Sequence, residues 1–313
     1  MSLEARMRQA LIRLPYGWPG GAVRLVAIGV LLPLMVACAG SGPRPVVHAA
    51  PVTTPTAIIP APADLLNATG PAANGVLWVL AGRPTSRTLH QIDIVSHADL
   101  RAVPAPASAT SVAETATGVL GLGLATSSTG AVQLRNGSSG ALLATVAVPA
   151  PVRAVAGGTT GSDLYVLTAN ATAASVSELD TATDHVLRTV PIPLLSVAAV
   201  PDPAQSALWV LQPNGVVDQV AISTGTITTQ FSIGNSGRAL ALSPDGSTLY
   251  VLKGRGVVRN VAVVDLATES VSRVLPAPRD TVGLVLSPDG STIYDLVGTA
   301  TVGNIQVFRS GAG

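Results

Sequence analysis

SPDGSTLY occupies Ser243 to Tyr250, and SPDGSTIY returns from Ser287 to Tyr294, 44 residues later, with one Leu changed to Ile. In such a phrase Pro presets the backbone angle at the second position of a turn, and Asp and Gly suit the next two positions. A turn of this kind joins two short antiparallel strands. The two phrases therefore predict two equivalent hairpins, and their spacing measures a repeating unit.

The tyrosines that end the two phrases belong to a longer series. The segments VLWVL, DLYVL, ALWVL, TLYVL and TIYDL align on one aromatic position, occupied by Trp78, Tyr165, Trp209, Tyr250 and Tyr294. With Leu122 standing where one copy lacks the aromatic residue, the intervals are 44, 43, 44, 41 and 44 residues. Five of the seven aromatic residues beyond residue 38 occupy this position, so the period is a property of the fold.

Each copy also contains a strand, a polar turn and a second strand after the aromatic segment. Asp93, Asp180 and Asp265 hold matching places at these turns, where we expect them to cap the local backbone. Four short strands every 41–44 residues are typical of β-propeller blades. We therefore predict an all-β, six-bladed β-propeller over residues 54–313, with a seven-bladed propeller as the alternative.

The two ends of this repeat predict how the propeller closes. The sixth copy stops in its third strand, near Asn304–Phe308, without an outer strand. IIPAP at Ile58 lies 20 residues before Trp78, just as VLPAP at Val274 lies 20 residues before Tyr294. The segment at Thr54–Ile59 thus reads as an outer strand without a blade, and we expect it to complete the last blade.

Residues 1–37 differ from the rest of the chain. Four arginines precede an apolar run from Leu25 to Ala37 that ends at Cys38, the only cysteine. A basic segment followed by a short apolar run is typical of an export signal. Met35–Cys38 resembles the lipobox of bacterial lipoproteins, which implies lipidation of Cys38 and anchoring to the outer face of the cell membrane; a buried free thiol or an uncleaved anchor is the alternative. Residues 38–53 suit a tether.

Composition limits the classes of partner. Hydrophobic residues make up 48% of the chain and charged residues 11%, with a net charge of +1. Without the leader, 14 basic and 16 acidic residues remain. No basic patch interleaved with aromatic residues is present, so we expect no nucleic-acid partner.

SPDGSTLYVL followed by VAVVDLATESVSRVLPAP resembles the YVTN-type repeat of bacterial surface and envelope β-propellers, which is related in pattern to lactonase-like propellers. The resemblance covers residues 54–313 and is weakest in the second copy. Because no catalytic constellation stands out in the sequence, we expect a non-catalytic binding or scaffold module for an envelope protein or cell-wall glycan. The lactonase-like relatives keep a metal-dependent hydrolase open as the alternative.

Candidate site residues follow from counting back from the aromatic position to the expected channel. Arg153 and Arg238 lie twelve residues before it and Asp64 and Asp280 fourteen before it, and we place Glu114 near the same level. The functional interpretation is one polar cluster at a channel mouth, where the arginines hold a carboxylate or phosphate. The alternative is a set of solvated loop residues.

The hydrolase alternative would require Asp64, Asp280 and Glu114 to converge on a divalent cation. The four histidines fall in the tether or in outer strand regions, and no catalytic triad or phosphate-binding loop is present. We therefore expect no cofactor, no metal and a monomer.

Overall fold

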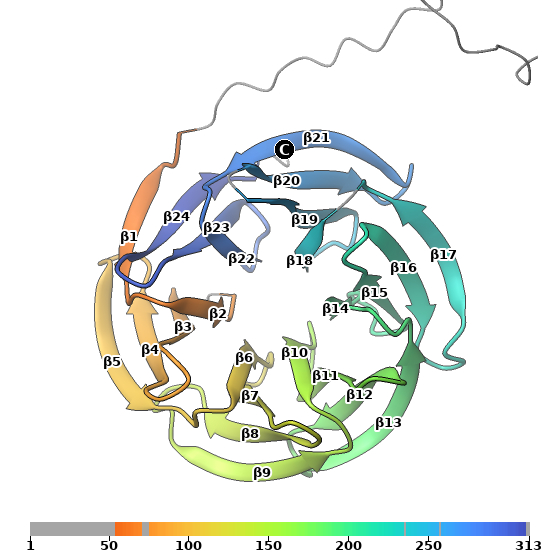
Figure 1. The fold of residues 1–313 in the computed structure, drawn as a ribbon, viewed down its shortest axis with the longest axis horizontal. Helices are drawn as coiled ribbons and strands as arrows, with labels where there is room; N and C mark the ends of the chain where they lie inside the picture. Colours follow the sequence, from red (N-terminus) through yellow and green to blue (C-terminus); the bar gives the residue numbers. More distant parts are fainter. Residues whose placement is uncertain (1–53, 71–74, 235, 257, 311–313) are drawn as a thin grey trace, which may run out of the picture. The chain divides into compact units, whose positions relative to one another are not determined.

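The computed structural model describes residues 54–70, 75–234, 236–256 and 258–310, and within them every element is a β-strand. The strands form six four-stranded antiparallel sheets that stand around a central axis like blades (Figure 1). The predicted all-β, six-bladed propeller is therefore confirmed, and the seven-bladed alternative is wrong. Residues 49–313 form one compact unit.

The blades follow one another along the chain, each running from an inner to an outer strand. Blade 1 contains β2 (Leu65–Ala68), β3 (Val76–Ala81), β4 (Thr88–Asp93) and β5 (Ala98–Pro104), and blade 2 contains β6 (Ala109–Glu114), β7 (Val119–Ala125), β8 (Gly130–Asn136) and β9 (Leu142–Val148). Blade 3 contains β10 (Val152–Gly157), β11 (Asp163–Ala169), β12 (Ala174–Asp180) and β13 (His185–Ile192), and blade 4 contains β14 (Ala198–Pro201), β15 (Ala207–Leu211), β16 (Val216–Ala221) and β17 (Ile227–Ser232). Blade 5 contains β18 (Gly237–Leu242), β19 (Thr248–Arg255), β20 (Val258–Asp265) and β21 (Ser270–Ala277).

Blade 6 is assembled from both ends of the described chain. Its first three strands are β22 (Thr281–Leu286), β23 (Thr292–Gly298) and β24 (Gly303–Arg309), and its outer strand is β1 (Ala57–Ala61). Ile58 pairs with Gln306 and Ala61 with Gly303, and β1 lies beside β24 in Figure 1. The predicted closure is confirmed. It satisfies the edge of β24, which would otherwise remain open.

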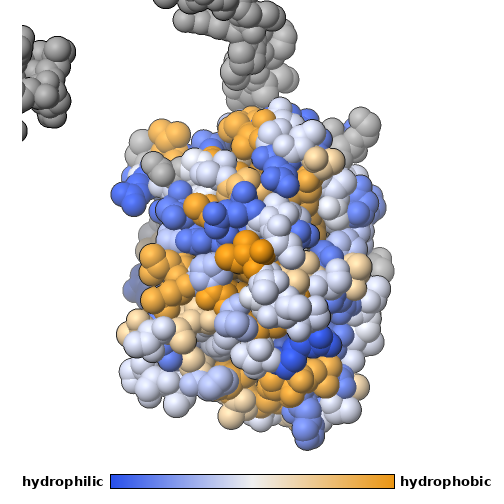
Figure 2. All heavy atoms as spheres, turned by 90° about the vertical axis from the view of Figure 1, so that its right-hand side faces the viewer, coloured by the Kyte–Doolittle hydropathy of each residue, from blue (hydrophilic) through white to orange (hydrophobic). Residues whose placement is uncertain are grey.

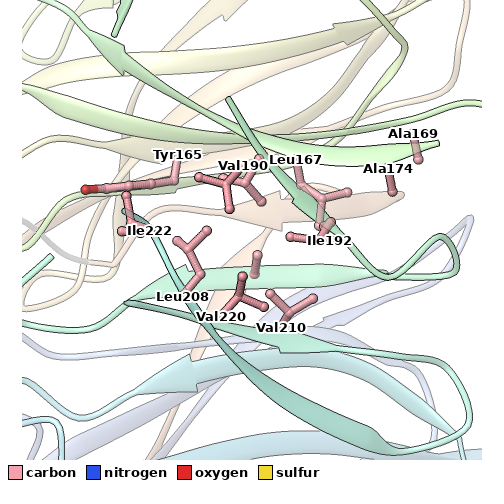
Figure 3. Packing of buried hydrophobic residues seen from close by; sticks show 12 residues of the cluster. Tyr165, Leu167, Ala169, Ala174, Val190, Ile192, Leu208, Val210, Val220 and Ile222 are labelled. Atoms are coloured by element: carbon pink, nitrogen blue, oxygen red, sulfur yellow. The ribbon is translucent and has the colours of Figure 1, made fainter. Parts of the chain in front are cut away.

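The repeated aromatic residues lie on the second strands of blades 1, 3, 4, 5 and 6 and are buried between blades. Figure 3 shows the contact between blades 3 and 4, where Tyr165 and Leu167 of β11 face Leu208 and Val210 of β15. The Tyr165 hydroxyl donates a hydrogen bond of 3.0 Å to Gln205 Oε1 of the next blade. The ring of Tyr165 thus fills the wedge between two sheets and connects them through its hydroxyl.

Blade 2 fills its place in the ring without an aromatic residue. Leu122 is fully buried, and its neighbours Gly121 and Gly123 have no side chains that would reach blade 3. A Cβ at Gly121 would lie 2.4 Å from Leu164, and a Cβ at Gly123 would lie 2.6 Å from Val152. The glycines therefore let side chains of blade 3 pack against the backbone of β7.

The two SPDG phrases form the turns between inner and second strands, as predicted. In blade 5 Gly246 N donates to Ser243 O at 2.9 Å, and the glycine has a φ of 74°, which few other residues adopt readily. Asp245 Oδ1 accepts from Ser243 Oγ at 2.5 Å and from Ser247 N at 3.0 Å. Blade 6 repeats these bonds around Asp289. The repeated phrase therefore serves to stabilise the turn.

The leader, the tether and Cys38 lie outside the described residues, so the predictions made for them stay predictions. In the part of the chain that the structure describes, no helix is long and apolar enough to cross a membrane.

Candidate functional site

The centre of the propeller is a channel. Six inner strands, namely β2, β6, β10, β14, β18 and β22, lie nearest the central axis (Figure 1). They line a cavity of about 850 Å³. Each of them is the edge strand of its sheet, so one side of its backbone has no partner within the blade. The channel wall therefore offers backbone N–H and C=O groups as well as side chains to a ligand.

One mouth of the channel is formed by six equivalent positions at the beginning of the inner strands. They are occupied by Leu66, Thr110, Arg153, Val197, Arg238 and Val282, and all six line the cavity. These are the positions that lie twelve residues before the aromatic position in the sequence. We call this end the arginine mouth.

A backbone irregularity places five of these six side chains. In every blade except blade 4, the pairing of the inner strand with the second strand shifts register across this residue, for instance between Val152 and Ala154 and between Gly237 and Ala239. A β-bulge leaves its extra residue unpaired and changes the direction of its side chain. Nothing in the sequence announces these bulges, because the residues at them are of different types.

Arg153 and Arg238 are both exposed at this mouth, in blades 3 and 5. Arg238 Nε donates to Gly254 O at 2.9 Å, which leaves its other guanidinium nitrogens free for a ligand. Neither arginine forms an ion pair with a carboxylate within residues 54–70, 75–234, 236–256 and 258–310. Two guanidinium groups without counterions are suited to an anionic ligand.

Asp64 and Asp280 lie on the same side of the propeller but do not line the channel. Asp64 has a φ of 54°, and its Oδ2 accepts from Arg83 Nε at 3.1 Å. Asp280 lies 3.9 Å from Arg279 Nε, and its carbonyl oxygen accepts from Gly298 N. These two residues hold the connections into blades 1 and 6.

Glu114 lines the channel at the opposite end, which corrects its placement beside the arginines. It is the last residue of β6, four residues beyond Thr110, or roughly 13 Å along a strand. A Cβ at Gly157, the last residue of β10, would lie 1.9 Å from Glu114 O, which places both residues at the same level. Burial raises the pKa of the Glu114 carboxyl to about 7. The expected cluster is therefore divided between the two mouths.

This division removes the metal site that a lactonase-like hydrolase would need. Glu114 and the two aspartates lie at different ends of the propeller. No group of three or more His, Cys, Asp and Glu residues in the described part of the chain is arranged to hold a metal ion. The three carboxylates that were expected to bind an ion, all of them among the described residues, therefore do not converge.

The aspartates of the outer turns act on the backbone, as predicted. Asp93 Oδ1 accepts from Val95 N at 2.7 Å and from Ser96 N at 3.0 Å. Asp265 accepts the same two backbone bonds in blade 5, and Asp180 accepts from Ala182 N and from the Thr183 hydroxyl in blade 3. Backbone donors hold the pKa of Asp93 below its usual value. These carboxylates are already used, so they are poor candidates for catalysis.

The outer wall of the propeller mixes apolar and polar side chains (Figure 2). A second hollow, of about 440 Å³, lies there between Leu187–Pro191 of β13 and Ile222–Gly225. Its one charged residue, Arg188, forms an ion pair of 2.7 Å with Glu178. This hollow therefore lacks a free charged group.

Sequence reasoning missed the cations that surround Arg238. Lys253, Arg255 and Arg259 lie where β19 ends and β20 begins, on the same side of the propeller. Burial and the nearby Arg238 lower the pKa of Arg259, which Asp280 partly offsets. These residues lie at other distances along the sequence from the aromatic position than the twelve and fourteen residues that were searched. The search therefore did not find them.

Comparison with known proteins supports the fold. No protein-family model matches this sequence, and no curated protein matches it either. Among solved structures, hydrazine synthase of Kuenenia stuttgartiensis is similar, with a TM-score of 0.58 and 16% sequence identity over 74% of this chain and 73% of that chain. A likeness at this level of identity concerns the β-propeller architecture alone.

Proposed function

We propose that this protein is an exported, lipid-anchored β-propeller of the bacterial cell envelope that binds a partner without catalysing a reaction. The partner is an envelope protein or a cell-wall glycan with an anionic group. Lipidation of Cys38 holds the propeller at the outer face of the membrane, and residues 38–53 tether it. The resemblance of the repeat to YVTN-type propellers supports the same placement.

The observation that carries this proposal is the arginine mouth. Arg153 and Arg238 point from bulged positions toward an open channel and have no carboxylate partner in the described residues. Guanidinium groups bind carboxylate and phosphate oxygens through paired N–H donors. The remaining positions at the mouth are Leu66, Thr110, Val197 and Val282, which supply no acid, base or nucleophile of the usual strength. An arrangement of this kind binds an anion and does not transform it.

Anion titration tests the mouth. Residues 49–313, which contain all the strands, are titrated with inorganic phosphate and with citrate, and binding is followed by NMR and calorimetry. We expect saturable binding that the double variant Arg153→Ala/Arg238→Ala loses. The matched control is Arg309→Ala, because Arg309 is an exposed arginine at the other side of the propeller. Unchanged binding in the double variant would exclude the mouth as the site.

The anchor has a separate test. The full chain and its Cys38→Ala variant are expressed in a bacterial host, and membrane and soluble fractions are compared. We expect the variant to lose lipid labelling and to remain uncleaved. Lipid labelling that persists in the variant would contradict lipidation at Cys38.

A further inference from the structure

The two faces of the propeller carry opposite charge. The arginine face consists of the turns between second and third strands and the connections that enter the inner strands. The aspartate face consists of the turns between first and second strands and between third and fourth strands. The arginine face carries six cations that form no ion pair in the described residues, namely Arg87, Arg153, Arg238, Lys253, Arg255 and Arg259.

Two further arginines of this face are neutralised locally. Arg83 pairs with Asp64 at 3.1 Å, and Arg279 lies 3.9 Å from Asp280. Lys253 Nζ donates to Ile233 O at 2.5 Å, so its acceptor is a carbonyl oxygen and not a carboxylate. The arginine face therefore retains a large excess of positive charge.

The aspartate face carries the opposite sign. Its turns include Asp180, Asp184, Asp202, Asp245, Glu269 and Asp289. Glu114 adds a carboxyl at the mouth of the channel on this side. A propeller with this separation of charge has a preferred orientation in front of any extended anionic surface.

Exposed apolar side chains accompany the cations on the arginine face. Leu195 is 67% exposed and Leu194 42%, and both lie in the connection from β13 to β14. Val258 is 66% exposed at the beginning of β20, and Val302 is 56% exposed in the turn between β23 and β24. On the aspartate face, Val95 is exposed in a turn, and Leu142 and Ile227 are exposed at the beginning of β9 and β17.

We infer that the arginine face docks directly on the surface of a bilayer that contains anionic lipids. This inference goes beyond the proposed function, whose partner is a protein or a glycan, because here the arginine face contacts the phosphate groups of lipids. The six cations contact headgroups, and Leu194, Leu195, Val258 and Val302 enter the interfacial layer. A soluble anionic polymer would attract the cations but would leave the exposed leucines and valines in water. The apolar side chains thus favour a lipid surface.

The proposed anchor is compatible with this orientation. β1 begins at the aspartate face, where Ala57 pairs with Val307, and runs toward the arginine face, where Ala61 pairs with Gly303. Sixteen residues from 38 to 53 can extend to about 55 Å. The longest strands have eight residues and rise roughly 26 Å. A lipid on Cys38 could therefore reach the bilayer from either face, and the charge decides which face contacts it.

Vesicle binding tests the inference. Residues 49–313 contain every strand together with its partners, so this fragment is used without the anchor, after circular dichroism has shown that it is folded. The probes are vesicles of phosphatidylcholine alone and of phosphatidylcholine with phosphatidylglycerol, and sedimentation measures binding. We expect binding to the anionic vesicles alone, weakened at least tenfold between about 0.05 M and 0.5 M NaCl.

Matched variants assign the face. Arg255→Glu is expected to weaken vesicle binding roughly tenfold or more, whereas Arg309→Glu makes the same charge change at the aspartate face and should leave binding unchanged. Leu195→Ser should weaken binding several-fold, and Leu143→Ser, at an exposed leucine of the outer strand β9, should not.

Equal effects of Arg255→Glu and Arg309→Glu would overturn the inference. So would retention on a soluble polyphosphate column without binding to anionic vesicles, which would identify a soluble polyanion as the ligand. In that case anion binding at Arg153 and Arg238 could still be present, so the proposed function would stand. If the unmodified fragment bound neither phosphate and citrate nor anionic vesicles, both the proposed function and this inference would be excluded.

Discussion

Blades 5 and 6 share the same turn phrase but differ in the origin of the outer strand and at one core position. Both begin with the same Ser-Pro-Asp-Gly turn, with the same hydrogen bonds around Asp245 and Asp289. The outer strand of blade 5, β21, follows directly in the chain, whereas the outer strand of blade 6 is β1 from the other end of the repeat. The second difference lies in the core, where Val251 of β19 corresponds to Asp295 of β23.

The core difference shows what a blade requires at this position. In blade 5 Val251 pairs with Leu240 and Ala262, an apolar row across the sheet. In blade 6 Asp295 pairs with Leu284 and Gln306. Asp295 is 1% exposed, its Oδ1 has no hydrogen-bond partner among the described residues, and burial raises its pKa to about 7. The two blades thus share their turns, whereas blade 6 alone of the two buries a carboxyl, whose Oδ1 has no hydrogen-bond partner among the described residues.

The largest effect is expected when the carboxyl of blade 6 is copied into blade 5. Val251→Asp buries an acid among Leu211, Leu249 and Val264, and it should lower the free energy of unfolding by roughly 3–5 kcal/mol at pH 8. Urea denaturation measures this loss. Val251→Ala is the control, because it removes the methyl groups without adding charge. If the two variants lose the same stability, blade cores accept carboxyls freely and Asp295 is not unusual.

A second prediction concerns the origin of the outer strand. Ile59 of β1 is fully buried between blades 6 and 1, and Leu275 holds the corresponding place in β21. Ile59→Ala and Leu275→Ala should each cost about 2–5 kcal/mol. Hydrogen exchange should distinguish them, because only Ile59→Ala loosens the joint between the two ends of the repeat. It should speed exchange in both β1 and β24, and equal local effects in Leu275→Ala would contradict a special role of closure.

The architecture could be predicted because it depends on period and turn chemistry, which the sequence contains directly. Trp78, set against Tyr294, was sufficient to find the stray strand at Ile58, and β1 pairs with β24 as the alignment required. The aspartates of the outer turns in blades 1, 3 and 5 were also identified correctly, since their hydrogen bonds are local in the chain.

The site was predicted less well, because its geometry depends on how far along the channel axis each residue lies and on the β-bulges. Glu114 lies eight residues before Leu122, and Arg153 lies twelve before Tyr165. Four residues span most of an inner strand, so the two side chains lie at opposite mouths of the channel. The same period could have assigned every charged residue to one of the two faces, from its distance in sequence to the aromatic position of its blade. The bulges that direct Arg153 and Arg238 leave no sequence signal.

A third prediction reverses the core difference and carries a pH dependence. The pKa of Asp295 is raised in the folded state, so the native protein binds the extra proton more tightly than the unfolded chain. Its contribution favours folding at low pH and is lost as the pH rises from about 4 to about 7, by at most about 1.4 kcal/mol per pH unit. Asp295→Val should remove this slope and raise stability by roughly 2–3 kcal/mol at pH 8. Melts of both proteins across this range measure it. A slope unchanged in the variant would assign the pH dependence to another group, Glu114 being the first candidate.

The smallest effects are expected at the turns, where the two blades should respond alike. Hydrogen bonds from Ser243 and Ser247 lower the pKa of Asp245 to about 2, and Ser287 and Ser291 do the same for Asp289. A carboxylate with a lowered folded pKa stabilises the protein above its unfolded value, near 4, and this contribution is lost as the pH falls through about 2. Asp245→Asn and Asp289→Asn should therefore each lower the melting temperature slightly at neutral pH and not at acid pH. Because both turns make the same bonds, the two losses should agree. A larger loss for Asp289→Asn would mean that the blade closed by β1 depends more on its turn than the continuous blade does. The two turns would then share a sequence but not an energetic role.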